Sequence, residues 1–250
     1  MSSKAAILKT ILQPHGFVKK GSCFYRFYRN EVVQVIGLER QRSLKTVVCA
    51  SLISVYHEKL PECLAEPPFL YTMGNFVGMR TGQRWDRETD ERLRPIYERG
   101  DCFVFEPTDE EDYRCLEQIV IPMLDECETQ SDLLRLFHQL DLAEYDRDQG
   151  VTTKRIYPAL AVGDYEQARH DIGEIEAQHS FAFENNRKRW SREECAQYLE
   201  REQAEMQPLY DIRELIERED YAALAEKLTQ LCERNTVVIA SFLSTPTRKK

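Results

Sequence analysis

The fold of this chain is decided by residues 23–56, which read CFYRFYRNEVVQVIGLERQRSLKTVVCASLISVY. Aromatic and β-branched residues dominate from Cys23 to Arg29 and again from Val32 to Leu38. This composition is typical of β-strands, and Asn30-Glu31 between the two runs is suited to a tight connection. The two runs therefore predict an antiparallel hairpin.

A third extended run follows at Thr46 to Tyr56, and it is largely apolar on both of its faces. One face carries Val47, Cys49, Ser51, Ile53 and Val55, and the other carries Val48, Ala50 and Leu52. A strand that is apolar on both faces belongs near the middle of a sheet with cover on each side. We expect helices or loops over both faces of this sheet.

Elements outside the sheet are predicted from helical periodicity and from helix-breaking residues. Ser3 is suited to cap a first helix that ends at Pro14 and Gly16. Prolines and glycines from Pro61 to Gly82 predict an irregular segment, which a short strand at Cys102–Phe105 follows. Two further helices are expected, one from Asp109 and one from Ser131.

The second half of the chain has a helical pattern. The polar stretch from Asp141 to Thr153 predicts a boundary, so we expect an α+β domain with an antiparallel sheet over residues 1–145 and a helical domain or extension over 146–250. Three substantial helices are expected there, and Ser191 with Glu194 forms a capping-box pair. The stretch Ala159–Ala168 resembles the turn of a tetratricopeptide unit; it is found once, which favours a single helical hairpin packed on the rest of the chain.

Composition and charge narrow the classes of function. The chain has 250 residues, of which 42% are hydrophobic and 31% charged, and a net charge of −9 that is spread over both halves. Nucleic-acid binding is therefore disfavoured, because it normally needs a concentrated positive surface. We expect a cytoplasmic protein without a leader or a membrane partner, since no long apolar run is present. The eight cysteines stand singly and are expected to be reduced.

A resemblance covers about the first 140 residues. The run Gly16-Phe17-Val18-Lys19-Lys20-Gly21-Ser22-Cys23-Phe24-Tyr25-Arg26, with Val33–Ile36 and Ile121–Leu124, resembles the bacterial family named domain of unknown function 4304. The resemblance implies an N-terminal helix, an antiparallel hairpin, further strands and then helices. It implies no established activity, and it suggests an immunity or accessory protein that binds a partner. The chain departs from the family pattern at Leu38–Gln41.

The first candidate site lies on the predicted hairpin, where Lys19, Lys20, Arg26 and Arg29 cluster with aromatic residues. Cations beside aromatic rings are suited to an anionic ligand or a partner surface. Alternation along the strand places Arg26 and Arg29 on opposite faces, however, so a solvated hairpin is the alternative interpretation.

The second candidate site is the irregular segment with Arg80, Arg84 and Trp85. Two arginines are suited to bidentate contacts with a carboxylate or a phosphate. The alternative is that Trp85 only anchors the loop on the core.

Motifs for catalysis, metals and cofactors are not found in the sequence. His170 with Glu166 and Glu174 shares one helical face, but this spacing alone is weak support for a metal, and His179 reads as a helix-face residue. No nucleophile elbow, phosphate loop or dinucleotide fingerprint is present. We therefore expect a non-catalytic protein-binding module without a cofactor. Its acidic helices favour a basic partner, and the alternative is a small anionic-ligand binder or an enzyme that uses the Arg80 segment.

Overall fold

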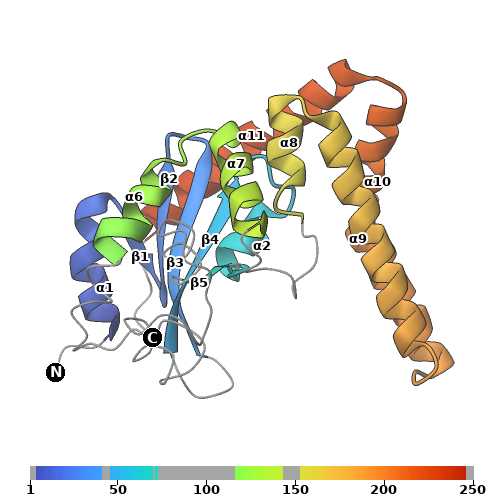
Figure 1. Cartoon of the computed structure of the whole chain (residues 1–250), viewed down its shortest axis with the longest axis horizontal. Helices are drawn as coiled ribbons and strands as arrows, with labels where there is room; N and C mark the ends of the chain where they lie inside the picture. The colour runs from blue at the N-terminus through green and yellow to red at the C-terminus, as the bar shows by residue number, and fades with distance from the viewer. Residues whose placement is uncertain (1–3, 41–45, 70, 73–115, 143–152, 246–250) are drawn as a thin grey trace.

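The computed structural model describes residues 4–40, 46–69, 71–72, 116–142 and 153–245 (Figure 1). The elements in chain order are α1 (Lys4–Leu12), η1 (Gln13–His15), β1 (Val18–Lys20), β2 (Cys23–Tyr28), β3 (Val32–Arg40), β4 (Thr46–Ser54), α2 (Leu60–Ala65), β5 (Tyr71–Thr72), η2 (Leu116–Val120), α6 (Ile121–Asp125), α7 (Gln130–Leu142), α8 (Ile156–Val162), α9 (Tyr165–Asn186), α10 (Arg192–Glu217) and α11 (Tyr221–Ser244). The predicted Ser3 cap, the Cys102–Phe105 strand and the helix start at Asp109 lie outside the described residues.

The sheet is antiparallel and five-stranded, with its strands in chain order β1-β2-β3-β4-β5. The predicted hairpin is confirmed as β2 and β3, which pair from Cys23 opposite Gly37 to Tyr28 opposite Val32. The turn centres on Arg29 and Asn30, one residue earlier than expected. Both residues have positive φ, at 51° and 60°. This backbone matches the twist of paired strands.

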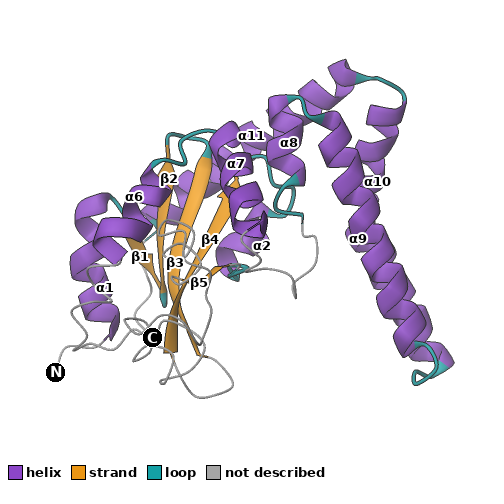
Figure 2. Cartoon of the chain, in the orientation of Figure 1, coloured by secondary structure: helices purple, strands orange, loops and turns teal. Residues whose placement is uncertain are grey.

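Both faces of the sheet are covered, as the third apolar run predicted (Figure 2). The face with Phe24, Ile36 and Leu52 packs against α1, α6 and α7. The opposite face, with Val35 and Ile53, packs against α2 and α11. Each Leu, Ile or Phe that is buried in these layers contributes roughly 1.5–3 kcal/mol. The α+β class with a mostly helical C-terminal half is therefore the observed fold.

The last helix joins the two halves of the chain. Asn235 of α11 is fully buried, and its side-chain amide donates to the backbone carbonyls of Val55 (2.6 Å) and His57 (2.9 Å) at the end of β4. Ile239 and Phe242 of the same helix pack on the sheet. The expected boundary between residues 145 and 146 lies outside the described residues, and α11 crosses back from the helical half to the sheet.

The turn at Ala159–Ala168 has a counterpart that the sequence interpretation missed. After α8, Gly163 and Asp164 donate to the carbonyls of Leu160 (3.1 Å) and Ala159 (2.8 Å). After α10, Glu219 and Asp220 make the same two bonds, to Ile216 (3.0 Å) and Leu215 (2.9 Å). Gly163 and Glu219 both have positive φ, and Asp164 and Asp220 both cap the next helix. The sequence interpretation missed the second turn, because Glu219 stands where the first turn has a glycine.

The two turns lie side by side. The rings of Tyr165 and Tyr221, each the first residue of its helix, stack with centroids 4.5 Å apart. The turns are 56 positions apart, at 163 and 219, about 22 more than the 34-residue period of tetratricopeptide units. The additional residues lie in α9 and α10, which project from the body of the molecule (Figure 1).

Candidate functional site

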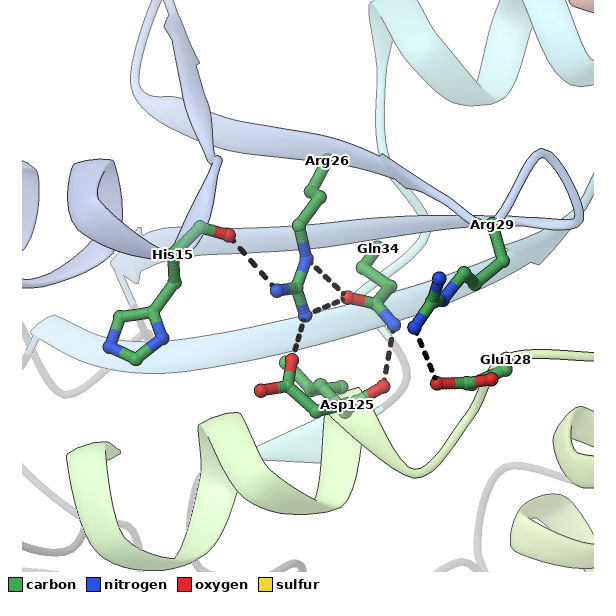
Figure 3. Close-up of polar contacts among 7 residues, drawn as sticks. His15, Arg26, Arg29, Gln34, Asp125 and Glu128 are labelled. Carbon is green, nitrogen blue, oxygen red and sulfur yellow. Dashed lines mark hydrogen bonds and ion pairs between the residues drawn. The ribbon is translucent and has the colours of Figure 1, made fainter.

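Arg26, a predicted site residue, lies in the interior of the structure (Figure 3). Its guanidinium donates to the side chain of Gln34 through Nε (2.9 Å) and Nη2 (2.5 Å), to the carbonyl of His15 (3.0 Å), and to Asp125 (2.6 Å). The rings of Phe17 and Tyr28 lie 4.5 and 4.3 Å from the guanidinium carbon. Through these hydrogen bonds, the guanidinium of Arg26 links β2 to η1 and α6.

This environment changes the interpretation of the hairpin cluster. The solvated-hairpin alternative is wrong for Arg26, which is only 7% exposed. Gln34 completes the network by donating to the carbonyl of Leu124 (2.6 Å). Arg29 follows the strand and pairs at the surface with Glu128 (3.3 Å). A ligand therefore has to displace internal bonds to reach the guanidinium of Arg26.

Lys19 and Lys20 lie on the edge strand β1, on opposite faces of the sheet. Lys19 is exposed, and its ammonium lies 5.9 Å from the centroid of the Phe24 ring. Lys20 donates to the backbone carbonyl of Thr245 and lies 5.8 Å from the ring of Phe242. The structure therefore does not bring the two lysines and Arg26 together into one site. The other predicted site residues, Arg80, Arg84 and Trp85, lie outside the described residues.

The most unusual surface of the described chain is an arm formed by residues 176–205, the outer parts of α9 and α10 (Figure 1). Ile175 and Met206 are the last core residues at its base, and none of the residues between them is buried. At 1.5 Å per residue, α9 extends about 16 Å beyond Ile175. The arm is therefore a pair of helices without a core of its own.

The end of this arm is basic and aromatic. Arg187, Lys188, Arg189 and Arg192 are exposed there, with no acidic residue from 187 to 192. Close by, the rings of Phe183, Trp190 and Tyr198 form a cluster with centroid separations of 5.0–6.4 Å. We call residues 187–192 the basic end. Its charge is opposite to that of the whole chain.

Aromatic and capping contacts hold the basic end in place. Ser191 and Glu194 form the predicted capping box, which is confirmed by bonds of 2.7 and 3.2 Å. The hydroxyl of Tyr198 donates to the carbonyl of His179 (3.3 Å), which links α10 to α9. The basic side chains are thus carried on a defined helical hairpin.

A cavity of about 160 Å³ lies where the arm meets the body. One wall is the turn after β4, with His57 and Lys59, and the other is the base of α9 and α10. Its lining comprises His57, Glu58, Lys59, Thr153, Tyr157, Ile175, His179, Glu205, Met206, Pro208 and Leu209. No sequence pattern predicts this cavity, because its walls come from segments far apart in the chain.

The histidine in this cavity has a defined tautomer. Burial lowers the pKa of His57 to about 4, so the ring is neutral at pH 7. Its Nδ1 accepts from the backbone N–H of Lys59 (3.1 Å), so the ring proton is on Nε2. That proton is donated to the hydroxyl of Thr153 (3.2 Å). His57 therefore cannot remove the proton of Thr153 as a general base.

Two buried thiols of the described residues are also poorly suited to covalent chemistry. Burial raises the pKa of the Cys63 thiol to about 11 and that of Cys127 to about 12. Both thiols stay protonated at neutral pH and are poor nucleophiles. Across the described ranges, no group of three His, Cys, Asp or Glu side chains is placed to hold a metal ion. In the same part of the chain, no helix is long and apolar enough to cross a membrane.

Comparison of the chain with protein-family models, with curated proteins and with solved structures finds no match. The resemblance of the first 140 residues to domain of unknown function 4304 therefore stays a prediction.

Sequence reasoning missed the arm, although two signals for it were present. The apolar stripe of α9 stops at Ile175, and apolar core positions resume at Met206 in α10. The run Arg187–Arg192 is a local concentration of positive charge in an acidic chain. A long helical pattern that loses its apolar stripe indicates helices that leave the body.

Proposed function

We propose that this chain is a non-catalytic protein-binding module whose contact element is the arm at residues 176–205. One observation carries the proposal: the arm projects from the body and has no buried residue between Ile175 and Met206. Helices shorter than about 12–15 residues are marginal in water without tertiary packing. The arm is the outer part of two longer helices, α9 with 22 residues and α10 with 26, and these outer parts bury no residue of their own, so a partner that covers them adds the packing that the arm lacks.

The chemistry of the basic end favours an acidic protein surface as the partner, in place of the basic partner that the net charge of the chain suggested. Four cations at Arg187–Arg192 lie about 16 Å from the core at Ile175. This distance is about twice the screening length of about 8 Å at physiological salt, so the acidic body hardly opposes the contact. The nearby acidic residues are those of the arm: Glu184 pairs with Arg187 (2.7 Å), and Glu193 and Glu194 follow Arg192. Trp190 and the arginines belong to the residue types that are enriched at the centres of protein interfaces. A long nucleic acid is less suited, since it would also meet the acidic body.

The assignment of a binding role rather than catalysis rests on the reactive groups. His57 donates to Thr153 and does not activate it, and the thiols of Cys63 and Cys127 stay protonated. The sequence-based alternative, a small anionic-ligand binder or enzyme at Arg80, Arg84 and Trp85, stays a separate proposal. Activity against a small substrate that disappears with an Arg84→Gln substitution would favour it.

Photo-crosslinking from the arm tests the proposal. A photoreactive phenylalanine analogue replaces Phe181, whose side chain is 71% exposed on α9. One variant neutralises the basic end by substituting Arg187, Lys188, Arg189 and Arg192 with Gln. The matched control substitutes Arg29, Arg135, Arg169 and Arg218 with Gln, which removes the same charge from exposed positions outside the arm.

The expected result is a reproducible crosslinked protein from the native host that resists nuclease treatment. Its yield falls at least tenfold in the basic-end variant and at higher salt, because complementary charges raise association rates. The control variant keeps the crosslink. Equal yields in both variants would exclude the basic end, and no reproducible partner would contradict the protein-binding role. Circular dichroism checks that both variants are folded.

A further inference from the structure

The cavity at the base of the arm is separate from the basic end. Its walls come from the turn after β4, from Thr153 and α8, and from the base of α9 and α10. A volume of about 160 Å³ is close to that of an engineered cavity of about 150 Å³ that binds benzene. The space is therefore suited to one ring-sized group, and it is smaller than typical pockets for drug-sized ligands.

Part of the lining is apolar and belongs to a rigid core. Ile175, Met206 and Leu209 are buried members of the hydrophobic cluster between α8, α9 and α10. Pro208 lies beside them inside α10, where it cannot donate a backbone hydrogen bond to the preceding turn. These side chains provide an apolar wall for the body of a ligand.

The polar part of the lining has unused hydrogen-bonding capacity. Thr153 accepts from His57, which leaves its own hydroxyl proton to donate to a further acceptor. Within the described ranges, three buried side-chain atoms have no hydrogen-bond partner: Ser51 Oγ, Glu58 Oε2 and His179 Nδ1. Two of the three belong to residues that line this cavity. Glu58 Oε2 lies 3.9 Å from the ammonium of Lys227, and His179 Nδ1 lies 4.0 Å from a carboxylate oxygen of Glu202. Buried polar atoms in native proteins are nearly always satisfied, by water or a ligand if not by protein.

The fixed charges around the cavity nearly cancel. Glu58 already pairs with Arg234 (3.4 Å) and Lys227 (3.9 Å). The remaining charged lining residues, Lys59 and Glu205, are of opposite sign. His57 is neutral at pH 7 because burial lowers its pKa to about 4. Neither an anion nor a cation therefore finds a net complementary charge.

We propose that this cavity binds an uncharged, ring-sized molecule that carries one hydroxyl group. The ring packs on Ile175, Met206 and Leu209, and the ligand oxygen accepts from the hydroxyl of Thr153. The ligand O–H then donates to the carboxylate oxygen Oε2 of Glu58, which accepts no hydrogen bond in the structure. The proposal does not rest on the basic end, because none of residues 187–192 lines the cavity; His179 and Glu205 are the lining residues that belong to the arm.

Methyl-detected NMR titration of the full chain tests this site with four probes of one size: phenol, toluene, benzoate and benzylammonium. We expect saturable phenol shifts centred on the methyl groups of Thr153, Ile175, Met206 and Leu209. We expect the other three probes to bind more weakly than phenol. Toluene lacks the hydroxyl group, benzoate adds a negative charge and benzylammonium adds a positive charge. Water-only occupancy predicts no saturable shift for any probe, and that result overturns the proposal.

Substitutions at Thr153 test the hydrogen bond. Thr153→Val keeps the side-chain shape and is expected to weaken phenol binding about fivefold, the effect of one ordinary hydrogen bond, with toluene binding unchanged. Thr153→Ser restores the hydroxyl and phenol binding. Thr10→Val, which removes an exposed hydroxyl from α1, serves as the control. The assignment is overturned if the Thr153→Val variant binds phenol as tightly as the wild type, or if benzoate binds most tightly of the four probes. Toluene binding by the Thr153→Val variant shows that it is folded.

Discussion

At the scale of single residues, Arg26 shows how a charge is accommodated inside an α+β core. Its donors meet Gln34, Asp125 and the carbonyl of His15, and two rings cover its faces. A buried charge is costly unless it is paired and hydrogen-bonded, and Arg26 is both. The residue therefore serves to orient η1 and α6 against the sheet.

Removal of this guanidinium is expected to destabilise the protein. Arg26→Met leaves the buried amide of Gln34 and the carboxylate of Asp125 without their donor, so the free energy of unfolding falls by about 2–4 kcal/mol. Urea denaturation measures this change. Arg29→Met is the control, because its ion pair with Glu128 lies at the surface and contributes far less. Similar losses in both variants would show that the network is unimportant.

His57 makes the stability of the protein dependent on pH. Burial lowers its pKa to about 4 in the folded state, whereas the unfolded chain titrates near pH 6.5. Between these values the unfolded state binds a proton that the folded state does not, so stability falls as the pH drops from 6.5 to 4. At pH 5 the loss from this group is about 2 kcal/mol.

A comparison with His57→Gln isolates this contribution. Urea unfolding at pH 7 and at pH 5 is expected to show that the wild type loses about 2 kcal/mol more than the variant between the two values. Equal losses in the two proteins would mean that His57 titrates normally in the folded state.

At the scale of elements, the two turns after α8 and α10 share one geometry with different residues. Gly163 and Glu219 both occupy the left-handed region, at φ values of 82° and 55°. An L-residue with a side chain is strained there, and glycine is not. A Cβ atom at Gly163 would meet no atom within 4 Å, so backbone strain alone determines the effect of a substitution.

Exchanging the residue types at these turns should have opposite effects. Gly163→Ala is expected to lower the free energy of unfolding by about 1 kcal/mol, and Glu219→Gly to raise it by up to about 1 kcal/mol. Thermal and urea denaturation of the two variants measure both changes. A stabilising Gly163→Ala would contradict the left-handed assignment at that turn.

At the scale of the whole molecule, the body and the arm differ in what stabilises them. The body has two covered sheet faces and a helical cluster in which α7 to α11 meet. The arm contributes no buried residue to any of these clusters. The body therefore contains almost all of the apolar burial that stabilises the described fold.

Shortening the arm should leave the body folded. Replacing Ser180–Arg201 with a short glycine-containing turn removes the basic end and the aromatic cluster but no buried residue. We expect cooperative thermal unfolding with a midpoint within a few degrees of the wild type, as measured by circular dichroism. A loss of cooperative unfolding would show that the arm is part of the folding unit.

Local patterns in the sequence predicted the three central strands of the sheet and their faces. They did not predict β1, and the segment expected to be irregular from Pro61 to Gly82 contains β5 and most of α2. Period-two alternation and turn residues act between neighbours in the chain, so β2, β3 and the two-faced β4 were predicted from residues 23–56. The capping box at Ser191 was predictable for the same reason. Each of these features depends on contacts within a few residues.

Long-range packing determines the remaining features: the environment of Arg26, the second turn at Glu219, the arm and the cavity. Arg26 is buried because Asp125, 99 residues away, is folded against it. Glu219 adopts a left-handed backbone without the glycine that signals one. The arm is exposed because the outer parts of α9 and α10 do not pack on the body. The cavity forms where the base of these two helices meets the turn after β4. Propensity and periodicity are local, whereas burial and charge environment depend on which distant segments pack together.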